Sequence, residues 1–503
     1  MPIARRDDLI VLLLTGLALA PFLLSERQIA GAAGLPLDDS WIHLHFARNI
    51  AEGAGFSYNP GVPVAGSTAP LWTLLLAAGV AIFGPSLLVV KGIGIACTLG
   101  AALVTRRAAI AWGAPQPAAL AAGLLFSWSG AAQWGALSGM EVSLAALLVA
   151  ATLLAHARQR LGWVAVLASL AVVARPETLI LVPLLALGQP LTVRRAAVFL
   201  STIALITAPA IAFSLMTVGA PIPATAAAKV EGGLIGWLAG VREPWVQTLF
   251  GRPWSFLKDW VFWLFSTHWL LPLSLLGFVI AWRERGRALG VPALALVLHP
   301  LAMALLAPYR GPGFQEGRYS IYLLPLAWLL FALLIGKTFA TRTGIALVFM
   351  LILSLPTLGD AAKRYGWAVQ NINAMQVELG RWIDRELPRD ARLALNDVGA
   401  IAYFSRREII DLMGLVTPEI LPYRREGEAG ILRYLERRCP DYLVIFPNWF
   451  PQLSARRDLF REIHTVHLDR NLVSGGDTMV VYETVWNRWR AAPRPCSKTR
   501  GGE

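Results

Sequence analysis

The sequence has few charged residues. Asp, Glu, Lys and Arg make up 15% of its 503 residues, whereas hydrophobic residues make up 56%. Soluble globular proteins carry about 25% charged residues, so this composition excludes an ordinary soluble protein. The apolar residues come in long runs, such as 9–24 and 196–216, and a bilayer-spanning helix needs about 20 mostly apolar residues. The chain is therefore predicted to be a polytopic α-helical membrane protein.

Cysteine is also scarce. The three cysteines, Cys97, Cys439 and Cys496, lie far apart without metal-like spacing, which argues against a metal site and gives no disulfide framework. A Gly-rich nucleotide-binding motif and internal repeats are missing as well. The first apolar segment lacks an obvious small-residue cleavage site and runs directly into the polar residues 25–27. We therefore expect a retained first helix and not a removed signal peptide.

Acidic residues are fewer than basic ones, and the net charge is +13. This excess does not indicate nucleic-acid binding, because many basic residues form short clusters between apolar runs, as the positive-inside rule expects of cytoplasmic loops. The clusters fall on one side of the membrane only if the short apolar piece 69–84 does not cross, so we predict a half-helix or interfacial helix there. The clusters are Arg5/Arg6, Arg106/Arg107, Arg158/Arg160, Arg194/Arg195, Arg283/Arg285/Arg287 and Lys337/Arg342.

The apolar runs predict eleven crossings, or twelve with the piece 69–84. The expected spans are 9–25, 86–105, 117–132, 139–155, 162–174, 177–191, 196–217, 263–281, 289–307, 319–336 and 343–358. On this topology the outer face collects the loop 26–85, the turns 138–141 and 175–177, the loops 218–262 and 308–318, and everything after about 359.

The chain is predicted to have two domains and a tail. Residues 1–358 form the transmembrane domain, and residues 486–503 look like a basic, disordered end. Between them, 359–485 alternates polar helical stretches with short β-like runs, which favours a small extracytoplasmic α/β domain. The β-like runs are 392–398, 408–413, 441–446 and 478–484.

An unusual pair of adjacent acids lies in the first outer loop. The stretch LPLDDSWIHLHFARNIAEGAGFSYNPG (35–61) places Asp38 and Asp39 among apolar and aromatic residues. One interpretation is that Asp39 caps the helix that follows it. Capping needs only one acid, however, and adjacent carboxylates repel each other near a low-dielectric boundary. Such a pair is useful where a proton is taken from a hydroxyl or a cation is held, and a carboxylate at a membrane is a functional hypothesis.

Two histidines follow on the same segment. His43 lies four residues after Asp39, so both would share one face of a helix. His43 and His45 are either polar residues of the membrane interface or hydrogen-bond donors to a phosphate or sugar. A zinc site is not expected, because a third metal-type ligand is missing nearby.

Four further charged residues lie at predicted helix ends on the outer side. Glu141 and Arg175 would anchor in the head-group layer or pair with each other, and Lys229 and Arg318 would either snorkel to the interface or bind a phosphate. An acid pair and several cations on one membrane face, beside helices that can hold a lipid tail, fit a lipid-phosphate-linked substrate. The cations would stabilise the leaving phosphate, and the carboxylate would take the proton of the incoming hydroxyl.

These residues resemble a known family. The segment 37–72 is similar to the first outer loop of bacterial GT-C glycosyltransferases, most closely to the branch with the terminal arabinofuranosyltransferases of mycobacterial cell walls. Segments 138–141, 175–177, 228–229, 317–319 and 396–420 match further positions in order. In the loop, the matching residues are Asp38, Asp39, Arg48, Asn49, Gly53, Gly55, Asn59, Pro60, Gly61, Leu71 and Trp72.

The resemblance implies a GT-C fold and an inverting glycosyltransferase on the outer face of the cytoplasmic membrane. Its donor would be a polyprenyl-phosphate-linked sugar, its acceptor a hydroxyl of a cell-envelope glycan, lipid or protein, and its sugar is left open. Asp38 would be the general base, with Asp39 assisting or binding a divalent cation (Mg, Mn or Ca).

The resemblance also assigns the remaining polar residues. Lys229, Arg318 and Arg175 would hold the donor phosphate, with His43 or His45 assisting, Glu141 would orient the sugar or a cation partner, and the outer α/β domain would hold the acceptor. Two other classes stay open: a transporter or flippase of lipid-linked sugars, for which paired inverted repeats would be expected, and a non-catalytic membrane scaffold.

Overall fold

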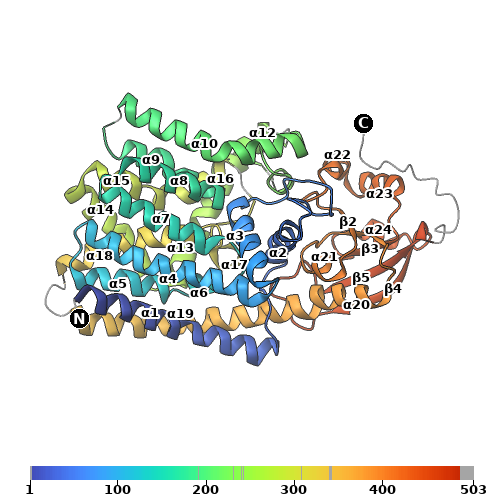
Figure 1. Ribbon diagram of the computed structural model, residues 1–503, viewed down its shortest axis with the longest axis horizontal. Coiled ribbons are helices and arrows are strands. Elements are labelled where there is room, and N and C mark those ends of the chain that lie inside the picture. Colours follow the sequence, from blue (N-terminus) through green and yellow to red (C-terminus); the bar gives the residue numbers. More distant parts are fainter. Residues whose placement is uncertain are drawn as a thin grey trace.

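A long helical bundle and a small sheet domain make up the protein. The computed structural model describes residues 3–487 except 191, 230–231, 239–240, 242, 307–308 and 339–342, so Arg342 and nearly all of the predicted disordered tail lie outside the described residues. The sheet domain lies at one end of the bundle (Figure 1). The helices α1 (Ile3–Ser25) and α19 (Thr343–Ile372) run side by side along the bundle. The predicted fold class, a helical membrane protein with a C-terminal α/β domain, is confirmed.

Six helices of the described part are long and apolar enough to cross a membrane, or eight when each of two bent pairs counts as one span. Four shorter apolar helices accompany them, so the predicted number of eleven crossings stays a prediction. The six helices are Arg5–Ala30, Leu87–Ala111, Val193–Val218, Arg287–Leu306, Phe314–Gly336 and Ile345–Glu386. The shorter ones are Pro70–Phe83, Gln116–Ser127, Leu161–Ala174 and Pro176–Leu187.

One predicted span is wrong as a single helix. The run 263–281 is broken after α13 (Arg252–Thr267), and α14 (Ser274–Arg285) belongs to a bent pair with an angle of 118°. His268 has extended backbone angles, and Pro272 follows it within one turn. Proline has no backbone N–H and is disfavoured in a helix interior, so the break follows from local chemistry that hydropathy does not report.

The remaining elements of the bundle are shorter pieces and their connections. They are η1 (Glu26–Ala30), α2 (Asp38–Ala51), α3 (Pro70–Phe83), α4 (Leu87–Ala111), α5 (Gln116–Ser127), α6 (Gly130–Leu137), α7 (Val142–Ala157), α8 (Leu161–Ala174), η2 (Pro176–Ile180), α9 (Leu181–Leu187), α10 (Val193–Val218), α11 (Ala224–Ala228), α12 (Gly233–Leu238), η3 (Gln247–Gly251), η4 (Leu271–Leu273), α15 (Arg287–Ala293), α16 (Ala295–Leu306), α17 (Phe314–Gly317), η5 (Ile321–Leu323) and α18 (Leu324–Thr338).

Basic side chains meet at the end of the bundle away from the sheet domain. Arg106 pairs with Asp7 at 2.8 Å and with Asp8 at 2.7 Å, which brings the end of α4 to the start of α1. The side chain of Arg285 reaches the surface over Gly113, just after α4. Since α1 starts at the far end (Figure 1), these predicted clusters share one end of the molecule.

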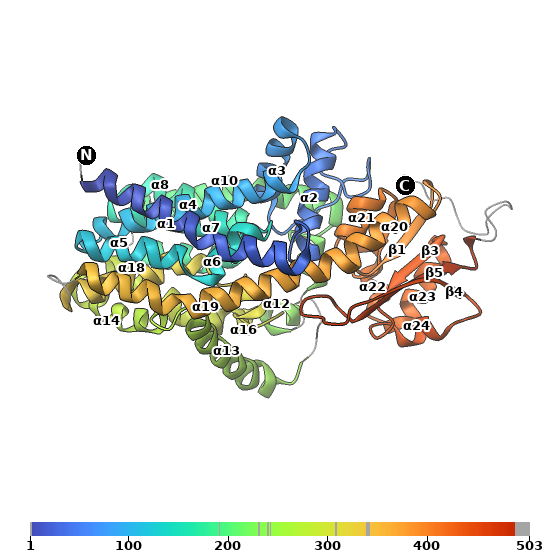
Figure 2. The same ribbon diagram turned by 90° about the horizontal axis from the view of Figure 1, so that it is seen from below.

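The helices α2 and α3 lie across the long helices of the bundle instead of along them (Figure 2). The helix α3 has 14 residues, which is short for a crossing of about 20 residues. It begins beside α2, because Thr73 in its first turn contacts His43 at 3.2 Å. This arrangement is the one expected of an interfacial helix, and it places α2 at the boundary between bundle and sheet domain.

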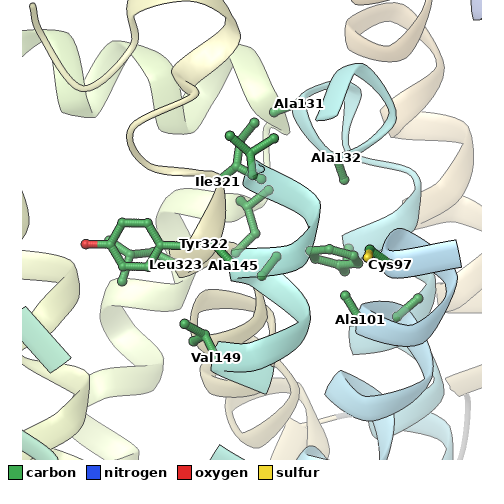
Figure 3. Packing of buried hydrophobic residues seen from close by; sticks show 14 of the residues in the cluster. Cys97, Ala101, Ala131, Ala132, Ala145, Val149, Ile321, Tyr322 and Leu323 are labelled. Atoms are coloured by element: carbon green, nitrogen blue, oxygen red, sulfur yellow. The ribbon is translucent and has the colours of Figure 1, made fainter. Parts of the chain in front are cut away.

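Small residues allow close helix packing in the bundle core. Figure 3 shows the side chains of α4, α6, α7 and η5 that pack there. A Cβ atom at Gly94 of α4 would lie 2.3 Å from the carbonyl oxygen of Ala136 in α6, so only glycine fits that contact. Membrane helices associate through such close van der Waals packing, because lipid gives them no hydrophobic driving force.

The sheet domain holds five strands in the order β2-β1-β3-β5-β4. The strands β2, β1 and β3 are parallel. The strand β5 pairs with β3 in antiparallel direction, and β4 pairs with β5, also antiparallel. The predicted β-like runs coincide with β1 (Arg392–Leu395), β2 (Glu408–Asp411), β3 (Tyr442–Ile445) and β5 (Thr478–Thr484). The strand β4 (Phe460–His467) was not predicted, because as an edge strand it has mostly polar, exposed residues.

Helices cover this sheet. They are η6 (Asn373–Val377), α20 (Glu378–Glu386), α21 (Ala400–Ser405), η7 (Pro418–Ile420), α22 (Leu421–Arg424), α23 (Gly427–Arg438) and α24 (Pro451–Ala455). Cys439, directly after α23, is disulfide-bonded. The spacing of the cysteines gave no disulfide framework, because spacing along the chain does not report distance in the fold.

The loop after α1, which the sequence predicts to lie on the outer face, is docked onto the sheet domain. Asn59 donates from Nδ2 to the carbonyl of Ile409 and accepts from its N–H through Oδ1, both at 2.8 Å. Arg48 donates from Nη1 to the carbonyl of Tyr403 at 2.7 Å, and the Tyr58 hydroxyl donates to the carbonyl of Val398. Several residues that carry the resemblance thus hold the two parts together.

Replacing Asn59 with Ala is expected to loosen this docking. Both hydrogen bonds to Ile409 are lost, and each is worth about 1 kcal/mol. The amide of Ile409 should then exchange faster in hydrogen–deuterium exchange of the protein in nanodiscs. Asn59→Asp keeps the oxygen that accepts from that amide and should preserve most of its protection. Equal protection in wild type and Asn59→Ala would show that the docking does not depend on this side chain.

Candidate active site

A cavity of about 880 Å³ lies between the bundle and the sheet domain. From the bundle side, the start of α2 and the segments around Lys229 and Arg318 line it. From the sheet domain, residues after β1, β2 and β3 line it, including Asp397, Met413 and Trp449. In open α/β sheets, ligands bind outside the carboxyl ends of the parallel strands. The sheet domain therefore faces the cavity with the edge at which such sheets bind ligands.

Asp39 is the centre of the charges in this cavity. Its Oδ2 accepts from Lys229 Nζ at 3.2 Å and from Arg318 Nη1 at 2.9 Å. Burial raises the pKa of Asp39, but the attraction of these two cations outweighs burial and lowers the pKa below its usual value. Asp39 is therefore ionised at neutral pH and holds both cations at the cavity wall.

Asp38 is bound by the sheet domain. Its two carboxylate oxygens accept from the N–H groups of Gly399 and Ala400, each at 2.7 Å, at the start of α21. A Cβ atom at Gly399 would lie 2.0 Å from the carbonyl oxygen of Asp38, so this approach requires glycine. Burial, and then the charge of Asp397, raise the pKa of Asp38 well above its usual value, while the two N–H donors oppose that shift.

The predicted capping role of Asp39 is wrong. The helix α2 starts at Asp38, its N-cap residue is Leu37, and no side chain caps it. Asp39 instead lies within the first turn, where its carboxylate points to Lys229 and Arg318. The acid pair does act at a helix end, but through Asp38 and at α21, a helix more than 360 residues away along the chain.

A second group of charged residues, Glu141 and Arg175, lies next to His43 of α2. His43 is 5% exposed, its Nε2 lies 3.5 Å from Glu141 Oε2, and burial lowers its pKa, so its imidazole is neutral. Glu141 forms a buried ion pair with Arg175, and Arg175 Nε lies 3.3 Å from Glu177 Oε2. The structure thus brings His43, Glu141 and Arg175 together, and the charges of Asp39 and Lys229 act on the imidazole.

His45 lies elsewhere. It contacts the carbonyl of Tyr58 through Nε2 at 2.9 Å and Arg48 Nη2 through Nδ1 at 3.1 Å. Burial lowers its pKa to about 3, and it is not among the residues that line the cavity. The structure therefore places His45 in the packing of the loop. His43, Glu141 and Arg175 are not among the residues that line the cavity either, whereas Asp38, Asp39, Lys229 and Arg318 are.

The sheet domain supplies cavity residues that the sequence analysis did not single out. Asp397 accepts from Gln376 Nε2 at 2.8 Å, and burial raises its pKa to about 6. Asn396 is 2% exposed, and its Nδ2 has no hydrogen-bond partner among the described residues. Trp449, 42% exposed, presents an aromatic ring. Asn396 and Asp397 lie at the end of the predicted β-like run 392–398, and Trp449 follows the run 441–446. These positions at strand ends were the available signal.

Three arginines were missed as well. Arg310, Arg424 and Arg425 line the cavity together with Lys229 and Arg318. Arg424 donates from Nη1 to the carbonyl of Met413 at 2.9 Å and to the carbonyl that precedes Lys229 at 3.2 Å. Arg310 and the adjacent Arg424 and Arg425 belong to no motif in the sequence, and only the fold brings them together.

The predicted divalent cation at the acid pair stays a prediction. The described residues contain no group of three or more His, Cys, Asp or Glu that could hold a metal ion. Asp39 accepts from two cations and Asp38 from two backbone N–H donors. We therefore derive no step through a metal ion.

Comparisons with known proteins agree with this architecture. The structure of ArnT from Cupriavidus metallidurans bound to undecaprenyl phosphate matches with a TM-score of 0.58 at 14% identity, over 94% of this chain and 97% of that one. The Archaeoglobus fulgidus oligosaccharyltransferase AglB, in complex with an inhibitory peptide and a dolichol-phosphate, matches with a TM-score of 0.58 at 13% identity, over 97% and 75%. A further structure of that oligosaccharyltransferase, tethered with an acceptor peptide, also has a TM-score of 0.58, at 13% identity over 87% and 68%.

Sequence comparison gives less. A family model described as a domain of unknown function, DUF8728, matches residues 369–488, the sheet domain and the helix that leads into it. No curated protein matches the sequence significantly. The fold is that of the GT-C membrane enzymes, as the structural matches show. The likeness to the arabinofuranosyltransferase branch stays a prediction.

Replacing Glu141 with Gln is expected to destabilise the protein by about 3 kcal/mol, because the buried charge of Arg175 then loses its buried carboxylate and keeps only the partly exposed one of Glu177. Thermal unfolding in detergent measures this. The matched control is Glu177→Gln, whose carboxylate also faces Arg175 but is 27% exposed, so its change should stay within about 1 kcal/mol. Equal destabilisation by both variants would contradict a dominant role of the Glu141–Arg175 pair.

The raised pKa of Asp397 predicts a pH-dependent stability. The pKa of this carboxyl is about 6 in the folded protein but near 4 in the unfolded chain. As the pH rises from about 4 to 6, the unfolded chain ionises first, so the free energy of unfolding falls. Asp397→Asn should therefore raise the unfolding temperature relative to wild type at pH 7.5 and not at pH 4. With partial solvent screening, the gain should be about 1 kcal/mol. A gain that is the same at both pH values would contradict this assignment.

Proposed function

We propose that the protein is a membrane glycosyltransferase. It transfers a sugar from a polyprenyl-phosphate donor to a hydroxyl of a cell-envelope glycan, lipid or protein on the outer face of the cytoplasmic membrane. The observation that carries this proposal is Asp39, which holds Lys229 and Arg318 side by side on the wall of a cavity about 880 Å³ in volume. That cavity lies at the end of a helical bundle of GT-C fold.

The two cations suit the donor phosphate. A lysine and an arginine on one carboxylate carry a net positive charge, and the arginine fork can bind phosphate oxygens in a bidentate manner. Arg318 Nη2 donates to the Tyr319 hydroxyl at 3.0 Å, and Arg175 lies over the Tyr319 ring at 4.9 Å. Phosphate bound there would be stabilised as charge develops on it during departure.

The reaction is a single displacement. The acceptor oxygen attacks the anomeric carbon, the bond from that carbon to the phosphate oxygen breaks, and the electron pair leaves with the polyprenyl phosphate, which inverts the anomeric centre. Asp38 takes the acceptor proton. Burial and Asp397 raise the pKa of Asp38, and a base is most effective when its pKa approaches the working pH. Asp39, with its lowered pKa, is the weaker base and acts by holding the cations.

The structural matches support the choice of substrates. Undecaprenyl phosphate is bound in the ArnT structure, and a dolichol-phosphate and a peptide are bound in an AglB structure. Both ligands contain a polyprenyl phosphate. The sheet domain, whose strand ends line the cavity opposite the cations, would hold the acceptor.

Two observations support an outer location of the site. The basic side chains around Arg106 and Arg285 lie at the opposite end of the bundle, and cytoplasmic ends carry the excess of Lys and Arg. Cys439 of the sheet domain is disulfide-bonded, and disulfides persist in oxidising compartments.

Asp38→Asn and Asp39→Asn are expected to reduce sugar transfer at least 100-fold, the first by loss of the base and the second by release of Lys229 and Arg318. The measurement is transfer in vesicles that contain the purified protein, a panel of polyprenyl-phosphate sugars and a mixed cell-envelope acceptor. The control is Glu378→Gln in the sheet domain, whose exposed carboxylate pairs with the exposed Arg385 on α20, and it should leave transfer unchanged.

Undiminished transfer in both aspartate variants would remove the acid pair from the chemistry. A wild-type protein that transfers no sugar but moves lipid-linked sugars across the vesicle membrane would favour the alternative function as a transporter or flippase. Loss of activity in Glu378→Gln as well would point to general unfolding and not to the site.

A further inference from the structure

The cavity carries more positive than negative charge. Five basic residues line it against the three acids Asp38, Asp39 and Asp397. Two of the five cations, Lys229 and Arg318, share the single carboxylate of Asp39. Even with all three acids ionised, two positive charges remain, and a group of negative charge would be needed to balance them.

Three of these cations, Lys229, Arg310 and Arg318, belong to a row in which basic groups alternate with aromatic rings. The row begins at Arg175, which is not among the residues that line the cavity. Arg175 and Arg318 lie on the Tyr319 ring, Arg318 and Arg310 on Phe314, and Arg310 and Lys229 on Tyr309. In that order, the distances from cation to ring centroid are 4.9, 5.0, 5.8, 5.6, 5.2 and 5.6 Å. Rings hold cations in place without neutralising them.

Three of the cations that line the cavity are not neutralised by acids. Arg310 has no acidic partner among the residues that the structure describes, and neither has Arg425. The guanidinium of Arg424 is held at the carbonyls of Ala228 and Met413, which orient it without cancelling its charge. The three side chains therefore present a positive charge beside Lys229 that the protein itself does not use.

This arrangement differs from ordinary surface arginines. Arg310 lies between two rings that line the same cavity, and Arg424 is anchored between the sheet domain and the segment before Lys229. Fixed guanidinium groups lose little freedom when they bind an anion. Hydrogen bonds from a charged donor to phosphate or carboxylate are about twice as strong as neutral ones.

We propose that Arg310, Arg424 and Arg425 bind a second anionic group of the substrates, next to the donor phosphate at Lys229 and Arg318. This inference rests on the proposed function and narrows its substrate class. The second anion is either the second phosphate of a polyprenyl-diphosphate donor or a carboxylate or phosphate on the acceptor. Both have the same oxyanion chemistry, and the experiment distinguishes them.

The test uses the full chain in nanodiscs and measures binding, so that it does not depend on transfer. In the first arm, the probes are undecaprenyl monophosphate and undecaprenyl diphosphate. In the second arm, methyl glucuronide is compared with methyl glucoside, which differ in one carboxylate. The double variant Arg310→Gln with Arg425→Gln is compared with wild type. Arg381→Gln is the matched control, because Arg381 is also exposed on an aromatic ring, 5.1 Å from the centroid of Phe404, but outside the cavity.

We expect wild type to bind either the diphosphate more tightly than the monophosphate or the glucuronide more tightly than the glucoside, by roughly 10- to 100-fold. The double variant should lose that preference while it still binds the monophosphate. A lost preference for the diphosphate assigns the anion to the donor, and a lost preference for the glucuronide assigns it to the acceptor. A wild type that binds the monophosphate but prefers neither probe, or a preference that survives in the double variant, overturns this inference alone. A wild type that binds no polyprenyl phosphate overturns the proposed function as well.

Discussion

The grip of the sheet domain on Asp38 is the contact on which the site depends. The outer loop and the sheet domain are far apart in sequence, yet the N–H groups of Gly399 and Ala400 bind both oxygens of one carboxylate. A carboxylate that accepts two backbone N–H groups is fixed in position more firmly than one held by flexible side chains, because the donors belong to a folded backbone. Asp38 also lines the cavity, and its contact with the sheet domain fixes the position of Asp39, the next residue.

From that contact the rest of the site follows by helix geometry. Because Asp38 is fixed at the start of α2, Asp39 points to Lys229 and Arg318, and His43, one turn later on the same face, meets Glu141. Each of these partners comes from a different segment of the bundle. The helix α2 is therefore a short element whose start is fixed by the sheet domain and whose side chains contact several segments of the bundle that are far apart in the sequence.

The sequence allowed part of this to be predicted. Long apolar runs and positively charged loops are local patterns, so the helical bundle and its end of basic clusters could be expected, and alternating hydrophobicity found four of the five strands. The edge strand β4 and the break at His268 could not, because exposed polar residues and a proline-associated turn leave the hydropathy pattern ambiguous. Asp38 and Asp39 were recognisable as an unusual pair, but their partners were not, since spacing along the chain does not tell which backbone N–H reaches a carboxylate.

The loop motif also has a meaning that resemblance alone did not give. Arg48 and Asn59 contact the backbone of the sheet domain, and His45 packs against Tyr58 and Arg48, all outside the cavity. The residues around the acid pair therefore serve the docking of the loop onto the sheet domain, in addition to the proposed sugar transfer. The cations of the cavity show the complementary case: Arg310 and Arg425 belong to no motif, but aromatic rings and the fold place them beside Lys229, where unneutralised charge can act only on a ligand.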